Sequence, residues 1–340
     1  MQLLSKLTCV EESLTQGGGP AGWPLLLAVA SVAVMVCGIE AQPAIAGRDN
    51  PMAPPDVYIR TLLVRDELEL IRLEMGKPQD TRQEPRVAEA ESREVFFGAL
   101  TLFHKVNRLS FDLTRGRAAP PDRPIGTLRP AHVMAVVDAV LTQLQRVKAT
   151  LGILESSRSK PRDPTATPSD VFRSIVQANR QVNLLLDRPI APSDVFQQVT
   201  LAVGYAAQLR AGFPGTRMPE APPFERRKRP ADVYHRLIEC FARIRAIMAH
   251  SGFRTLTLDQ HPDAITPNDV YDIASLIVSE LSFLHAQVDD ALPPLDPYDP
   301  GRKLPAEVYQ RAGLLELLLI DLQALVKTSS SWLQTQNEGE

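Results

Sequence analysis

The sequence predicts an all-α repeat protein, on three observations. A motif of the form Pro-x-acid-Val-aromatic recurs eight times with small variations. Its central valines are separated by steps of 38, 38, 38, 24, 38, 37 and 38 residues. At 4, 7, 11, 14 and 18 positions after each valine, 37 of 40 residues are apolar, the exceptions being Thr61, Pro189 and Ser251. This 4-3-4-3 spacing places one apolar stripe along a helix, suited to coiled-coil-like packing, and excludes strands.

Each motif has the chemistry of a helix start. Proline is tolerated at the first helical position, and an acid in the first turn favours the positive end of the helix dipole. Thr167 and Thr266 can also cap the exposed N–H groups. The eight predicted helices, each of about 20 residues and about 30 Å, begin in order at PPDVY (54–58), SREVF (92–96), PAHVM (130–134), PSDVF (168–172), PSDVF (192–196), PADVY (230–234), PNDVY (267–271) and PAEVY (305–309).

The single short step, between Val171 and Val195, divides the helices into two sets of four. We therefore expect a duplicated four-helix unit, spanning 47–188 and 189–328, followed by a polar tail at 329–340. Helices four and five are joined only by DRPIAP (187–192), which requires a tight hairpin or bend. Longer Pro-rich connectors separate the other helices and leave parallel neighbours possible. The general preference of helix bundles favours antiparallel packing.

The N-terminus resembles an export signal. Residues 23–39 form an uncharged run of 17 residues, and AQPAIA (41–46) follows with the small-x-small pattern of a signal-peptidase site. Residues 1–46 are therefore predicted to be a signal peptide cleaved before Gly47, which places the mature chain in the periplasm of a bacterial-type envelope. The alternative is an uncleaved inner-membrane anchor at 23–39, because 17 residues is the lower edge of a membrane span.

Composition and motifs indicate a protein that is not an enzyme. The net charge of −3 argues against nucleic-acid binding. Only Cys240 lies in the predicted mature chain, on the apolar stripe, which indicates a buried thiol rather than a nucleophile. No phosphate-binding glycine loop and no helical zinc motif is present, and His261 with Asp263 is interpreted as a solvated pair. We expect no catalytic residue, cofactor or metal.

Two groups of residues are candidates for contacts with a ligand or partner. An aromatic follows the valine in seven motifs and either packs at the helix start or lines a groove for a ligand: Tyr58, Phe96, Phe172, Phe196, Tyr234, Tyr271 and Tyr309. A basic run before the sixth helix is either solvated or contacts anionic envelope material: Arg226, Arg227, Lys228 and Arg229. The eighth helix is apolar beyond one stripe, so it is either deeply buried or presents a face to a partner.

Two functions fit these features. The first is an exported, non-enzymatic interaction or scaffold module that contacts an envelope protein. The alternative is a periplasmic module that binds or senses a small ligand in a pocket between helices or between the two halves, where such sites prefer to lie. An enzyme with a site assembled across the halves is a weaker third interpretation. A cavity lined by convergent polar groups would favour the ligand-binding function, whereas solid packing would favour the scaffold.

Overall fold

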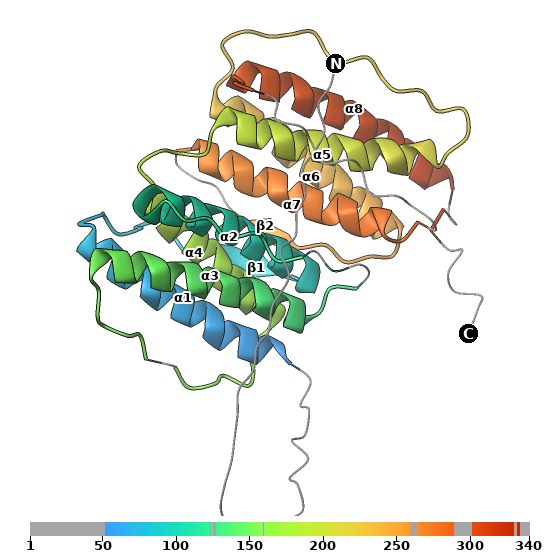
Figure 1. The fold of residues 1–340 in the computed structure, drawn as a ribbon. Helices are drawn as coiled ribbons and strands as arrows, with labels where there is room; N and C mark the ends of the chain where they lie inside the picture. The colour runs from blue at the N-terminus through green and yellow to red at the C-terminus, as the bar shows by residue number, and fades with distance from the viewer. Residues whose placement is uncertain are drawn as a thin grey trace, which may run out of the picture. The chain divides into compact units, whose positions relative to one another are not determined.

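Eight helices, one for each repeated motif, make up most of the described chain, so the all-α prediction is confirmed (Figure 1). The computed structural model describes residues 52–122, 124, 127–158, 160–259, 264–288, 301–329 and 332–333. The helices are α1 (Pro54–Glu74), α2 (Ser92–Thr114), α3 (Pro130–Leu151), α4 (Pro168–Leu185), α5 (Pro192–Ala211), α6 (Pro230–His250), α7 (Pro267–His285) and α8 (Pro305–Thr328).

The N-terminal segment that carries the export and anchor predictions, and the pair His261 and Asp263, lie outside the described residues. Within the part of the chain that is described, no helix combines the length and apolar character needed to cross a membrane.

The repeated acid caps the helix that it begins. In seven helices an Asp or Glu at the third helical position accepts the backbone N–H of the residue before the helix, at 2.7–3.0 Å. In α3 the Nδ1 atom of His132 takes this place at 3.1 Å. The hydroxyls of Thr167 and Thr266 also accept N–H groups of the first turn. These bonds satisfy donors that a helix start would otherwise leave unpaired, and they explain why the motif is repeated.

The apolar stripe is the core. All eight motif valines, and the residues 4, 7, 11 and 14 positions after each of them, are at most 3% exposed. The one polar member, Thr61, is also buried, and its hydroxyl donates to the carbonyl oxygen of Tyr58 at 2.8 Å. Burying one stripe per helix against its neighbours supplies the main driving force for folding.

Within each half of the molecule, helices that follow one another in sequence do not all pack together. In the first half, α1 and α2 each pack against α3 and α4, so α1 lies diagonally across from α2. In the second half, α5 and α6 each pack against α7 and α8 in the same way. Long connectors between helices allow these diagonal steps.

The helices of the first half are parallel, so the antiparallel expectation is wrong. Arg60, in the first turns of α1, pairs with Asp138 in the first turns of α3 at 2.6 Å, and Glu67 pairs with Lys148 further along both helices. The starts of α2 and α4 also meet, because Gly98 lies against Phe172. Beyond the ends of α1 and α4, Lys77 pairs with Asp187 at 2.8 Å.

The second half repeats this parallel arrangement. Near the starts of α6 and α8, Arg236 donates to the carbonyl oxygen of Tyr309 at 3.1 Å. Near the ends of α5 and α8, Arg210 pairs with Asp321 at 3.0 Å. A connector of about 15 residues can span about 45–50 Å when extended, which is enough to return along a 30 Å helix. The long connectors therefore permit parallel neighbours that a short loop would forbid.

The short connector between α4 and α5 reverses the direction of the second half. Six residues, 186–191, separate the two helices and cannot return along a helix. The halves consequently meet through the antiparallel helices α2 and α7 (Figure 1). Two strands in the connectors, β1 (Arg86–Ala88) and β2 (Thr257–Asp259), pair antiparallel beside this junction, with Val87 opposite Leu258. The helical period gave no signal for these strands.

Candidate functional site

Two ion pairs, one buried and one partly buried, join α2 to α7. The Nζ atom of Lys105, on α2 and fully buried, lies 2.6 Å from Oδ1 of Asp272 on α7. About 18 Å away along α2, roughly half the length of that helix, Nε of Arg93 lies 3.2 Å from Oε2 of Glu280 on α7. Burying charges costs hydration, so such pairs are weak evidence of net stability. Both pairs connect the first half to the second.

Arg93 gathers a cluster of carboxylates. Besides Glu280 it contacts Glu91 and Glu94, donates to the carbonyl oxygen of Arg254 at 2.6 Å, and stacks on a phenyl ring. Glu94 and Glu280 are both fully buried, and each has an oxygen without a hydrogen-bond donor among the described residues. Burial, followed by the nearby Glu94 charge, raises the pKa of Glu280 well above its usual value. Burial and the neighbouring carboxylate therefore favour the protonated form of Glu280.

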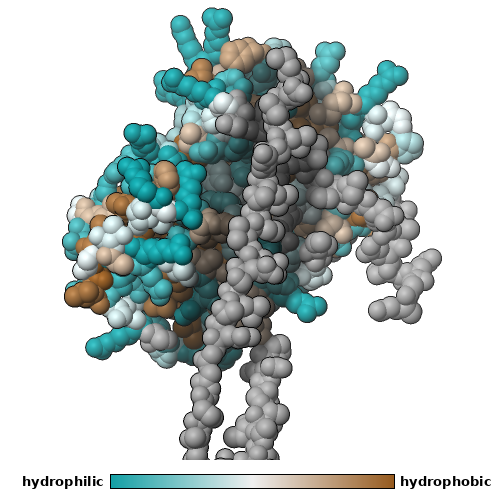
Figure 2. All heavy atoms as spheres, in the orientation of Figure 1, coloured by the Kyte–Doolittle hydropathy of each residue, from teal (hydrophilic) through white to brown (hydrophobic). Residues whose placement is uncertain are grey.

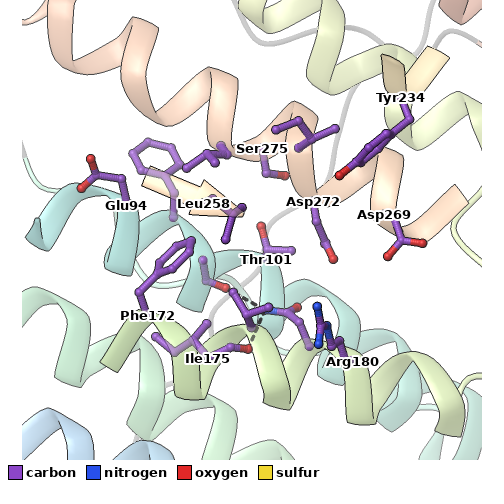
Figure 3. Close-up of a pocket in the computed structure, with 16 residues that line it drawn as sticks. Glu94, Thr101, Phe172, Ile175, Arg180, Tyr234, Leu258, Asp269, Asp272 and Ser275 are labelled. Carbon is purple, nitrogen blue, oxygen red and sulfur yellow. Dashed lines mark hydrogen bonds between the residues drawn. The ribbon is translucent and has the colours of Figure 1, made fainter. Parts of the chain in front are cut away.

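A cavity of about 60 Å³ lies at the same junction, with Glu94 and Asp272 both on its walls (Figure 3). Its walls come from α2 and α4 of the first half, and from α6, α7 and β2 of the second half. One end is mainly apolar and is formed by Phe172, Ile175 and Leu258, with the buried Glu94 beside them. The other end carries Arg180, Asp269, Asp272 and the hydroxyl of Tyr234. The junction is therefore not packed solid.

The charges at the polar end are only partly paired. Asp269 lies 3.4 Å from Arg82, and Oδ1 of Asp272 is held by Lys105. Burial raises the pKa of Asp272, even though 34% of its side chain remains exposed. This exposed part faces the cavity (Figure 3). Burial, together with the carboxylates of Asp269 and Asp272, also raises the pKa of Tyr234.

Arg180 is the least satisfied cation of the site. Its Nη1 atom donates to the carbonyl oxygen of Gln83 at 2.8 Å, and among the described residues no carboxylate lies within ion-pair distance of its guanidinium. Burial, and then the neighbouring Arg82, lower its pKa. Next to it, Asn179 donates from Nδ2 to the carbonyl oxygens of Gly98 and Ile175, at 3.2 and 3.1 Å. Its Oδ1 is buried and has no donor among the described residues.

The structure brings two of the seven repeat aromatics together. Phe172 and Tyr234, from different halves, line the cavity. Phe96 and Tyr271 are buried as well. Tyr58, Phe196 and Tyr309 are half-buried. Of these, Phe196 is covered by Lys303 and Arg311, and Tyr309 by Lys228 and Arg236.

The basic run is split between internal and exposed roles. Lys228 pairs with Glu225 at 2.6 Å and lies 4.0 Å from the centre of the Tyr309 ring. The side chains of Arg226, Arg227 and Arg229 are exposed. The structure brings no described part of this run to the cavity.

Cys240 is buried on the stripe, and burial raises the pKa of its thiol to about 12, so a thiolate nucleophile is disfavoured there. No group of His, Cys, Asp and Glu side chains in the described ranges has the arrangement of a metal site.

On α8, Leu317 and Ile320 are 36% and 39% exposed, whereas the neighbouring stripe residues are buried. Figure 2 shows apolar residues scattered among hydrophilic ones on the visible face.

Sequence reasoning missed the residues that define the cavity. Asn179, Arg180 and Asp272 are ordinary polar positions beside the stripe, and nothing in their local spacing distinguishes them from solvated residues. Lys105 and Asp272 meet across 167 residues of sequence. The weak signal that existed was the aromatic motif position, which supplies Phe172 and Tyr234.

Comparison of the chain with family models, with curated proteins and with solved structures gives no match.

Proposed function

We propose that this protein is a non-enzymatic binding module that holds a small polar ligand in the cavity between its halves. The observation that carries this proposal is the cavity itself, with polar groups from both halves on its walls and the unsatisfied Oδ1 of Asn179 among them. Ligand sites prefer such junctions, where a few fixed polar groups orient the ligand against apolar walls. The proposed site is outside the cytoplasm, on the strength of the export-like run at 23–46.

The two halves are proposed to be copies of one ancestral four-helix unit. This is supported by the nearly constant valine step and by the order of packing, since the contacts of α1–α4 recur one for one in α5–α8. A single fused pair then creates an internal junction that neither half would have alone. The cavity at that junction belongs to both copies.

A thermal-shift screen tests the ligand-binding function. The panel contains small amines, carboxylic acids, amino acids and sugars at millimolar concentration. A ligand at a hundred times its dissociation constant stabilises the folded state by about 2.7 kcal/mol, which raises the Tm of a chain of this size by about 5 °C. No shift from any member of the panel would contradict the proposal.

A matched pair of variants localises the binding. Val176 is half-buried and lines the cavity, so Val176→Phe should fill part of it and abolish the shift. Leu201 is half-buried on α5 and does not line the cavity, so Leu201→Phe should retain the shift.

A scaffold function is the second candidate, and the exposed pair Leu317 and Ile320 favours it. These residues lie one turn apart on α8 and present apolar surface that a partner helix could cover. A protein with this function would show no stabilisation by any small molecule in the same screen.

A further inference from the structure

One wall of the cavity carries hydrogen-bond donors that are suited to an anionic group. The guanidinium of Arg180 has five N–H donors, of which one is used by the carbonyl oxygen of Gln83. It is half-buried, and no described carboxylate neutralises it directly. The hydroxyl of Tyr234 lies at the same end and makes no hydrogen bond to any described residue (Figure 3). Together these donors suit a carboxylate, which a guanidinium can bind through two parallel bonds.

Hydrogen-bond acceptors suited to a cationic group also line the cavity. One oxygen of Asp272 is held by Lys105, whereas the other accepts no hydrogen bond from a described residue and belongs to a side chain that faces the cavity. The buried Oδ1 of Asn179 also lacks a donor in the described part of the chain. Two unfilled acceptors, one of them charged, suit an ammonium group with its three donors.

The charges around this end balance. Three cations, Arg82, Lys105 and Arg180, interact with three carboxylates, Asp80, Asp269 and Asp272. A ligand with a single charge would leave one unit of charge uncompensated in a partly buried site, which is costly. A ligand that carries both signs and no net charge avoids this cost.

The apolar residues of the cavity shape the rest of the ligand. Phe172, Ile175 and Leu258 favour an apolar group over a polar one. The cavity is open to solvent, since 34% of the Asp272 side chain is exposed, so its volume of about 60 Å³ does not set the largest ligand that can enter.

We propose that the ligand is a zwitterion, a free α-amino acid with a small side chain. Arg180 and Tyr234 bind its carboxylate, Asp272 and Asn179 accept from its ammonium group, and the apolar end holds its side chain. This inference rests on the proposed function, since it names the ligand class of the same cavity.

Isothermal titration of the full-length chain with three matched probes tests the inference. L-Alanine has both charges, propionate lacks the ammonium group, and ethylamine lacks the carboxylate. We expect L-alanine to bind at least tenfold more tightly than either single-charge analogue, since one lost charged hydrogen bond costs about that factor.

Two variants on the anion-binding wall link the affinity to the site. Arg180→Met should weaken L-alanine binding by more than tenfold, and Tyr234→Phe by roughly tenfold. Arg173→Met is the control, because Arg173 lies on the same helix, pairs with Asp170 and does not line the cavity. Tyr234→Phe removes only a hydroxyl, so it remains informative if Arg180→Met fails to fold. Asp272 is left unchanged, because its replacement would leave the buried Lys105 without its carboxylate partner.

The outcomes separate this inference from the proposed function. Binding of propionate or ethylamine as tight as that of L-alanine would overturn the zwitterion and leave a small-ligand module. Unchanged affinity in both Arg180→Met and Tyr234→Phe would place the ligand elsewhere and overturn the assignment of the site. Absence of binding by L-alanine, propionate and ethylamine overturns the ligand class. The proposed function is overturned only if no member of the thermal-shift panel stabilises the protein.

Discussion

At the scale of single residues, the repeated motif divides its work clearly. The valine enters the core, the acid caps the helix start, and the proline fixes the first helical position. The aromatic that follows is less uniform. It is buried in α2, α4, α6 and α7, and half-buried in α1, α5 and α8. The aromatic therefore adapts to what surrounds each helix, while the valine and acid do not.

The buried pair Glu94 and Glu280 should make the free energy of unfolding depend on pH. Because burial raises the pKa of Glu280 above the ordinary value of 4.5, the folded state keeps a proton that the unfolded state releases. The free energy of unfolding should therefore fall as pH rises from about 4.5 through the folded pKa. Glu280→Gln carries no such proton and should lose the part of this fall that Glu280 contributes, while Glu94, whose pKa burial also raises, keeps its own part.

We expect Glu280→Gln to match the wild type near pH 4 and to become more stable than it, by about 1–3 kcal/mol, above the folded pKa. Urea unfolding at pH 4 to 8 measures the difference. Glu239→Gln, at an exposed position on α6, serves as the control and should follow the wild type throughout. Parallel profiles for Glu280→Gln and the wild type would show that Glu280 is ionised in the folded state.

At the scale of the helices, what could be predicted followed from short-range chemistry. The 4-3-4-3 spacing located every helix, and Thr167 and Thr266 were correctly identified as caps. The order of packing depends instead on contacts between distant residues, such as Arg60 with Asp138. The two three-residue strands were not predicted, because Val87 and Leu258 pair across a long stretch of sequence and neither segment has a strand pattern of its own.

The stripe provides the prediction at this scale. Leu144 is fully buried on α3, so Leu144→Asp would place an unpaired carboxylate in the core and cost more than about 4 kcal/mol. The neighbouring Gln145 is exposed, and Gln145→Asp should change stability by less than about 0.5 kcal/mol. Thermal unfolding of the two variants checks this, and a Leu144→Asp protein that melts with the wild type would exclude the stripe as the core.

At the scale of the whole molecule, connector length determines the architecture. Long connectors let four helices run parallel in each half, and the six-residue connector at 186–191 turns the second half around. This reversal brings α2 against α7 and places Lys105 opposite Asp272. The cavity is a consequence of that meeting. Neither its position nor its polar residues can be seen in one repeat, because every wall comes from a different helix.

A crystal structure of the full-length chain grown with saturating L-alanine tests the central claim most directly. The account predicts one amino-acid molecule in the cavity between α2, α4 and α7, with its carboxylate at Arg180 and its ammonium group at Asp272. A cavity that holds only water under those conditions, or two halves that meet through helices other than α2 and α7, would contradict it.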